Sequence, residues 1–441
     1  MKKKIVYLLI GLIIILIASY FIRYKTGNNI SHCIPKDAVA AISLNTRQIE
    51  HHFLIDFMYN PYEFIKEFKS KKEDSIKYFY LYKDINLPKN IIFYTKDSLF
   101  KTWVSSKIEL NNLKNITDLL TSNNFELTNI NKLNIYHKNK FYVILQDTNM
   151  YLCITNNISD AINTYLKETD FISEESAMYK QLNNSTSDIS FATFKKNTID
   201  ISFENGKIEI LGNLHSNLLK ETSTIKNDSL IVNISVSFNK NSKTFKKLIS
   251  YINHEKFRKL TKINLDTLVD KWTGNLHFTL NNFKTKIDTI ITYTYDDDFN
   301  KIENIDTKKN ITPRFNLNLG MQSNISSYLE KSGALKVIQN DSIFVSLPIL
   351  KTYISTTVNS FSFLTNNKKL KFSKQHNKFA GNININEYRK QSDSTIFSFF
   401  NEYLLIKNAN IVIKNNNNIK ATIGINTERN SFVFLAKKSL D

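Results

Sequence analysis

The stretch Ile201-Ser202-Phe203-Glu204-Asn205-Gly206-Lys207-Ile208-Glu209-Ile210 carries the clearest structural signal in the chain. Apolar and polar residues alternate on both sides of Asn205-Gly206, as they do in strands with one buried face. Asn and Gly tolerate the positive φ angles that a two-residue type I′ turn requires. The stretch therefore predicts an antiparallel β-hairpin that turns at Asn205-Gly206.

Short alternating runs recur on both sides of this hairpin. They predict strands near residues 38–45, 91–96, 100–110, 133–137, 141–147, 149–154, 230–238, 274–282 and 286–295, from Pro313 onward, and around a turn at Asn415–Asn418. Apolar residues spaced three and four apart predict amphipathic helices near 49–57, 113–120, 158–166, 245–252, 325–329, 396–404 and 430–438. Antiparallel hairpins mixed with such helices indicate the α+β class.

The chain has 441 residues, which is too many for one ordinary hydrophobic core. We expect a transmembrane anchor at 1–25, a linker at 26–33, a first α+β domain at 34–187 and a second α+β region at 188–441. A further split of the second region near residue 312 stays open, so two or three antiparallel-sheet-plus-helix domains follow the anchor. Strand-then-helix units open at 38, 188 and 313, but they do not align well enough to establish a repeat.

An uncharged segment, Ile5–Ile22, follows three lysines near the N-terminus. As a helix it would be about 27 Å long, close to the hydrocarbon thickness of a bilayer. The alternatives fit less well: Tyr20-Phe21-Ile22-Arg23 is a poor signal-peptide cleavage site, and Cys33 lies too far along for a lipoprotein. Because positive charge before the segment exceeds the charge after it, we expect a single-pass membrane protein whose body is extracytoplasmic, either periplasmic or at the cell surface.

The formal net charge is +19, yet only six of the 59 basic residues are arginine. Asparagine is abundant while glycine and proline are scarce, which is the bias that an A/T-rich genome imposes. Sequence-specific readers of nucleic acid rely on bidentate arginine contacts, and no basic block of five residues occurs. We therefore expect lysines spread over solvated faces, no nucleic-acid partner, and at most weak attraction to anionic surfaces.

The residue types that support catalysis or metal binding are present only as isolated groups. A glycine-rich phosphate loop, Gly-x-Ser-x-Gly, His-Glu-x-x-His and Cys-x-x-Cys do not occur in the sequence. The groups that we considered and set aside are the pair His51-His52, His254-Glu255, the acidic run Asp296-Asp297-Asp298, Trp103, Trp272, Cys33 and Cys153. We assign no catalytic, cofactor-binding or metal-binding residues and expect no cofactor. A triad assembled in space from distant residues stays open.

The start of the body resembles a known group of proteins. Ile34-Pro35-Lys36-Asp37-Ala38-Val39 leads into Ile42-Ser43-Leu44-Asn45, and later Tyr151–Asn156, Met178–Leu182 and Ile189 follow in order. These segments resemble a broad group of anchored bacterial envelope proteins of unknown function, with an Ile-Pro-x-Asp-Ala start and repeated α+β units. The resemblance covers about the first 200 residues and lacks the lipid-anchor cysteine of some members. It implies architecture and location but no activity.

These observations favour a membrane-anchored, extracytoplasmic binding or scaffold protein of the bacterial envelope over an enzyme. We expect its partner to be another protein or a lipidic or anionic polymer of the envelope. The alternative is a membrane-tethered hydrolase without a recognisable motif. An enzyme should present converging polar groups with perturbed pKa values in a cleft, whereas a binding module should present an exposed apolar groove or sheet face.

Overall fold

A computed structural model of the whole chain describes residues 32–62, 84–130, 133–157, 159, 170–224, 230–295, 297–338, 341–345, 352–365, 375–391 and 405–440. The chain divides into two compact units. Unit 1 comprises Met1–Leu214 together with Thr427–Asp441, and unit 2 comprises His215–Asn426. Unit 1 thus extends to Leu214 and also includes the C-terminal segment. The domains expected at 34–187 and 188–441 stay predictions.

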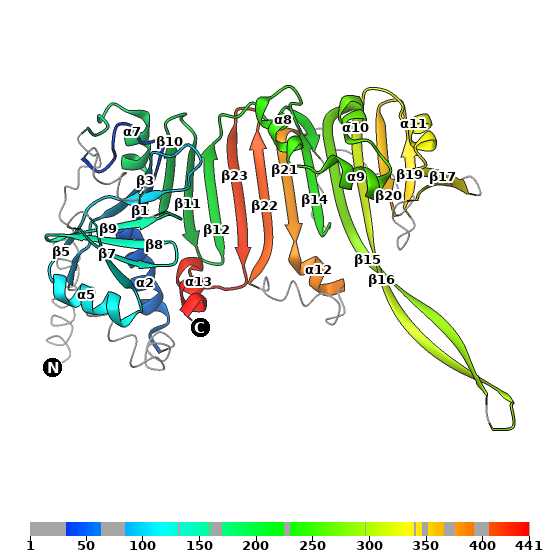
Figure 1. Cartoon of the computed structure of the whole chain (residues 1–441), viewed down its shortest axis with the longest axis horizontal. Coiled ribbons are helices and arrows are strands. Elements are labelled where there is room, and N and C mark those ends of the chain that lie inside the picture. Colours follow the sequence, from blue (N-terminus) through cyan, green and yellow to red (C-terminus); the bar gives the residue numbers. More distant parts are fainter. Residues whose placement is uncertain are drawn as a thin grey trace, which may run out of the picture. The chain divides into compact units, whose positions relative to one another are not determined.

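Unit 1 is organised around strand β1 (Ala40–Asn45), which is flanked by two antiparallel partners. On one side lies β3 (Asn90–Thr95), and on the other lies β10 (Ile189–Thr193). The sheet continues from β10 through β11 (Thr198–Glu204) to β12 (Lys207–Asn213). Figure 1 shows these strands side by side.

The predicted hairpin at Asn205-Gly206 is confirmed as a two-residue connection between β11 and β12. Gly206 has a φ of 66°, but the φ of Asn205 is not positive. The turn therefore requires a glycine at its second position only and is not the expected type I′ turn, which needs positive φ at both positions.

A second antiparallel group completes unit 1. Its strands are β2 (Ile85–Asn86), β4 (Trp103–Ser105), β5 (Ile108–Leu110), β6 (Glu126–Ile130), β7 (Leu133–Lys138), β8 (Phe141–Gln146) and β9 (Asn149–Ile154). Strands β6 to β9 form a meander, while β4 and β5 both pair with β9. Helix α5 (Leu113–Ser122), capped by the Asn112 side chain, buries Ile116 and Leu120 against this group.

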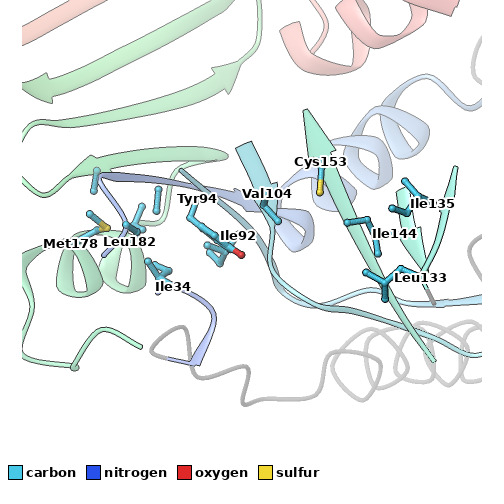
Figure 2. Packing of buried hydrophobic residues seen from close by; sticks show 13 residues of the cluster. Ile34, Ile92, Tyr94, Val104, Leu133, Ile135, Ile144, Cys153, Met178 and Leu182 are labelled. Atoms are coloured by element: carbon cyan, nitrogen blue, oxygen red, sulfur yellow. The ribbon is translucent and has the colours of Figure 1, made fainter. Parts of the chain in front are cut away.

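The main core of unit 1 brings together residues from distant parts of the sequence. Tyr94 and Val104 come from the sheet, Ile34 from the segment before β1, and Met178 and Leu182 from helix α7 (Ala177–Asn184). Figure 2 shows these side chains among their neighbours. The periodic spacing of Met178 and Leu182 explains the burial, because residues four apart lie on one helix face.

Unit 2 is also antiparallel. Its strands are β13 (Thr222–Thr224), β14 (Val232–Ser237), β15 (Trp272–Tyr295), β16 (Lys301–Met321), β17 (Leu335–Ile338), β18 (Asp341–Phe344), β19 (Tyr353–Thr356), β20 (Ser360–Leu364), β21 (Gln375–Asn384), β22 (Ile406–Lys414) and β23 (Asn418–Ile425). Pairing runs from β23 through β22, β21, β14, β15, β16, β20 and β19 to β18, which pairs with β17.

Five helices of unit 2 are described: α8 (Lys243–Ser250), α9 (His254–Thr261), α10 (Leu265–Lys271), α11 (Ser326–Lys331) and α12 (Ile385–Gln391). Phe245 of α8 and Leu329 of α11 are buried in a core centred on Trp272 and Phe361. Trp272 is thus a core residue, in agreement with the sequence interpretation. Its indole Nε1 donates to the carbonyl oxygen of Asn275 at 2.6 Å.

The longest element is the hairpin of β15 and β16. Their register runs from Trp272 opposite Met321 to Tyr295 opposite Lys301, with irregularities between Trp272 and Leu276 and between Leu280 and Asn282. Strand β14 pairs with β15 only as far as Leu280, and β20 pairs with β16 only from Asn316 onward. Residues 282–314, called the distal ribbon below, therefore extend beyond both neighbours (Figure 1). The separate strands expected at 274–282 and 286–295 are one continuous strand.

The α+β assignment is wrong: the described residues form mostly antiparallel sheet. Their helices are short, from six residues in α11 to 14 in α2 (Thr46–Tyr59), whereas β15 and β16 contain 24 and 21 residues. Residues 301–312 were not assigned to a strand because Lys, Asn and Asp interrupt their apolar alternation. Two expected helices, 396–404 and (except for Ser159) 158–166, lie outside the described residues.

The assignment as a single-pass membrane protein is also corrected. The anchor expected at Ile5–Ile22 lies outside the described residues. Within the described part of the chain, none of the helices is sufficiently long and apolar to cross a bilayer. An uncharged run of the right length permits such a helix without establishing it, so the anchor, the membrane partner and the extracytoplasmic location that depended on it are not retained.

Candidate functional site

A buried ion-pair cluster joins helix α2 to the C-terminal segment within unit 1. The Asp56 side chain is only 1 % exposed, and it accepts hydrogen bonds from two nitrogens of Arg429, including Nε at 2.8 Å. Lys437 of helix α13 (Ser431–Leu440) lies 3.3 Å from the same carboxylate. Burial alone would raise the pKa of Asp56, but the hydrogen bonds and charges of Arg429 and Lys437 lower it below its usual value.

His52 lies in a second buried polar group one helical turn away. Its Nε2 is 2.6 Å from Oδ1 of Asp188, and its Nδ1 is 3.1 Å from the amide nitrogen of Asn430. Because an amide NH₂ can only donate, Nδ1 accepts, and the ring proton lies on Nε2 and is donated to Asp188. The same amide nitrogen donates to the carbonyl oxygen of Phe203 at 2.7 Å.

The remaining contacts of Asp188 and Asn430 are also satisfied. Asp188 Oδ2 accepts the backbone N–H of Phe203 at 2.7 Å. Asn430 Oδ1 accepts the N–H groups of Phe432 and Val433 and so caps helix α13. We interpret the His52 group as a clasp for the C-terminal segment, since both ring nitrogens are occupied and no hydroxyl or thiol faces them among the described residues.

A histidine and a serine also meet in unit 2. His277 Nδ1 is 3.1 Å from Ser235 Oγ, and both side chains are buried. Burial lowers the pKa of His277 to about 4. A hydroxyl paired with a histidine is the arrangement that activates a serine nucleophile. This pair, however, is closed off from substrate, and a base with a pKa near 4 is poorly matched to neutral pH.

The residues set aside in the sequence do not assemble into a metal site in the structure. His51 is exposed whereas His52 is buried. His254 Nδ1 lies 3.4 Å from Asp266. In the part of the chain that is described, no group of three His, Cys, Asp or Glu side chains could hold a metal ion.

The two cysteines and Trp103 occupy structural positions. Cys153 is buried in the core of unit 1, Cys33 packs against that core, and no disulfide joins the two. Burial raises the pKa of the Cys153 thiol to about 12. Trp103 stacks on Phe100.

The distal ribbon carries the second candidate site, an apolar sheet face in contact with solvent. Directly opposed residues of an antiparallel pair share a face, and that face alternates along the strands. Ile291 lies opposite Ile305, and the same face of β15 also carries Tyr293 two residues later and Ile287 four residues earlier. The other face has Thr292 opposite Asn304 and is more polar, although it also carries Ile290 and Ile302.

Eight large apolar side chains of the ribbon are exposed, a surface that monomeric proteins seldom leave uncovered. They are Ile287, Ile290, Ile291, Tyr293, Tyr295, Phe299, Ile302 and Ile305. Neither outer edge of residues 282–314 has a strand partner among the described residues. Both edges therefore offer backbone N–H and C=O groups to an additional strand.

The ribbon ends in an acidic turn that also displays an aromatic residue. Phe299 is 87 % exposed and has a φ of 61°, a conformation that bulky residues seldom adopt. Asp297 and Asp298, from the acidic run noted in the sequence, are exposed in the same turn, while Asp296 lies outside the described residues. Lys301 Nζ lies 3.5 Å from the centroid of the Tyr293 ring, a cation–π contact at the base of the turn.

Sequence reasoning identified the strand from 286 to 295 and the acidic run but did not identify their combination as a site. Alternating Ile and Tyr predicts that one strand face is covered. The three-dimensional structure shows that Phe283 at the base of this face packs against Tyr388 of α12, whereas Ile287, Ile291 and Tyr293 are exposed. No signal in the sequence distinguishes an apolar strand face that is covered from one that is exposed.

Comparisons with known proteins give little further information. No family model matches the chain, and no curated protein matches it. Solved structures of a protein named TP0453, in crystal forms III and IV, align with 77 % and 76 % of this chain and with 93 % and 92 % of that chain. Sequence identity is 8 % and the TM-score is 0.24 in both cases, too low to carry an argument about fold or function. The resemblance to anchored envelope proteins stays a prediction.

Proposed function

We propose that this chain is a binding or scaffold protein that engages a protein partner through the distal ribbon. The observation that carries this proposal is the gathering of eight exposed apolar side chains on one two-stranded ribbon. An isolated two-stranded ribbon is at best marginally stable in water, so a partner that covers its apolar face stabilises it as well as binding it.

Two features favour a protein partner over a lipid surface. The unpaired edges of the ribbon supply backbone donors and acceptors that another polypeptide can satisfy, whereas the interior of a bilayer cannot. The acidic turn around Asp297 and Asp298 would also be repelled by anionic lipid headgroups.

The alternative of a hydrolase without a recognisable motif has weaker support. Both histidines with suitable neighbours, His52 and His277, are buried among satisfied groups. The exposed apolar face is the feature expected of a binding module. The anchor and the envelope location are not part of the proposal, because the described residues do not support them.

Site-specific photocrosslinking in cells tests the proposal. A photoreactive residue at Ile291 or Ile305, on the apolar face, should give a crosslinked product of defined mass. The same residue at Thr292, on the opposite face of the same strand, is the matched control and should give far less. Equal products from both faces, or none from Ile291 and Ile305, would falsify the proposed role of the ribbon.

A further inference from the structure

Resting on the proposed function, we propose that the protein partner is a second copy of this chain. The acidic, aromatic end of the distal ribbon (the ribbon tip, residues 295 and 297–303) docks on the basic surface formed by helices α8 and α9 of the next copy. The contact joins two different surfaces, so it is heterologous and propagates head to tail.

The receiving surface combines positive charge with exposed apolar side chains. Residues 243–262 contain seven basic residues and one acidic residue, Glu255. The seven are Lys243, Lys246, Lys247, Lys256, Arg258, Lys259 and Lys262, and all are exposed. This concentration departs from the even spread of lysines expected from the sequence. Asp266 and Asp270 in α10 are the nearest acidic residues along the chain.

The exposed apolar side chains of this surface do not belong to the hydrophobic core of unit 2 that lies beneath the two helices. Phe245 is buried, and Ile249 and Phe257 pack against the core of unit 2, so both helices already have a covered face. On the outside, Tyr251 is 73 % and Leu260 is 63 % exposed. A partner with its own exposed aromatic group can cover them.

The ribbon tip has the complementary composition. Its described residues include three acidic ones, Asp297, Asp298 and Glu303, and one basic one, Lys301. Phe299 extends from this turn into solvent, and a bulky residue at positive φ is unfavourable unless something offsets the strain. Insertion of Phe299 among Tyr251 and Leu260, with Asp297 facing the lysines, satisfies both surfaces.

The tip cannot reach the same surface of its own chain. Both elements belong to unit 2, and twelve residues separate Phe283 from Tyr295 along the free part of β15. At about 3.3 Å per residue the tip lies on the order of 40 Å beyond the sheet. In Figure 1 the ribbon runs away from α8 and α9. The complementary surfaces can therefore meet only between molecules.

A contact of one turn on two short helices is smaller than a standard stable interface, so affinity in the micromolar range is expected. Because its attraction is largely between exposed charges, the contact should weaken as salt shortens the screening length to about 8 Å.

Sedimentation velocity of the full chain at low salt tests this. As the protein concentration is raised to about 100 µM, the wild type should form progressively larger oligomers. A helix variant, Lys247→Glu with Lys256→Glu, and a tip variant, Asp297→Asn with Phe299→Asn, should each associate at least about tenfold more weakly. Asn tolerates positive φ, so the tip variant keeps the turn. The matched control Lys331→Glu with Lys336→Glu makes the same change in charge elsewhere on unit 2 and should behave as wild type.

Mixing separates the head-to-tail contact from a symmetric one. The helix variant retains a normal tip and the tip variant retains a normal helix surface, so the mixture should form one-to-one heterodimers and nothing larger. A symmetric ribbon-to-ribbon contact cannot give this result. Wild type that stays monomeric, or helix and tip variants that assemble as wild type does, would overturn the inference.

Two other results would also overturn the inference. The first would leave the proposed function intact, and the second would identify another ligand for the helix surface. Crosslinks from Ile291 to a different protein, with a monomeric wild type, would mean a ribbon partner other than this chain. A helix variant that loses binding to phosphatidylglycerol vesicles but assembles normally would mean a lipid-binding helix surface. All variants retain residues 1–31, so that segment contributes equally.

Discussion

At the scale of single residues, burial fixes the protonation state of several titratable side chains in different ways. Burial lowers the pKa of His277 to about 4, so its imidazole is neutral beside Ser235 at neutral pH. Burial raises the pKa of Cys153 to about 12 and keeps it a thiol. Asp56 stays ionised in spite of its burial, because Arg429 and Lys437 compensate its charge.

His277 makes the stability of unit 2 depend on pH. The ring has a pKa near 6.5 in the unfolded chain and about 4 in the folded one, so the unfolded state binds more protons between these values. Stability should therefore fall as pH drops from 6.5 toward 4, by roughly 2–3 kcal/mol at pH 4.5. Urea unfolding at pH 7.0 and pH 4.5 measures the loss.

The His277→Gln variant is the control, since it does not titrate in this window and can still bond to Ser235. It should lose much less stability than wild type between the two pH values. An equal loss in both proteins would show that other groups cause it. Asp56 is not one of these, because its lowered pKa confines its contribution to more acidic pH.

At the scale of elements, local patterns predicted those strands and helices whose burial is set by neighbours in the sequence. Strands β7, β8 and β9 lie close to the expected positions, and so do α5, α8 and α13. The hydrogen-bonded group around His52 could not be predicted. His52 and Asn430 are separated by 378 positions, and the local sequence around one residue gives no indication of contact with the other. The exposure of the apolar face of the distal ribbon could not be predicted either. An alternating pattern indicates that a strand has an apolar face, but it does not indicate whether another element covers that face.

The turn between β11 and β12 gives a direct test of an element. Gly206 has a φ of 66°, which alanine resists, so Gly206→Ala should lower the free energy of unfolding of unit 1 by about 1 kcal/mol or more. Asn205→Ala is the matched variant in the same turn, where φ is not positive, and should lose less. Chemical denaturation of both variants compares them, and similar losses would argue against backbone strain as the cause.

At the scale of the whole molecule, unit 1 is built from two separate pieces of chain. Unit 2 lies between them in the sequence, and the second piece is held by the Asp56 ion pair, by the His52 group and by aromatic contacts of Phe432 with Phe53 and Phe203. These contacts tie the stability of the N-terminal sheet to residues more than 200 positions further along the chain.

Asp56→Asn should destabilise unit 1 by about 3 kcal/mol at neutral pH, because it leaves the partly buried Arg429 without its counter-charge. Lys437→Met removes the 3.3 Å contact with Asp56 but leaves Arg429 paired with the carboxylate, so it should have a smaller effect. Labelling of Cys153 in a Cys33→Ser background measures opening of unit 1, since a buried thiol with a pKa of about 12 reacts only when exposed. Labelling no faster in Asp56→Asn than in Lys437→Met would contradict the expected order.

The two-piece construction of unit 1 has a consequence for its synthesis. A ribosome completes roughly 200 residues of unit 2 before residues 427–440 emerge, which takes about 10–40 s at 5–20 residues per second. During that interval the nascent N-terminal sheet has Asp56 and His52 without the groups that neutralise and cap them in the finished protein. Unit 1 therefore passes through an obligatory incomplete state while its polypeptide is being made, when chaperones and proteases have their best access to it.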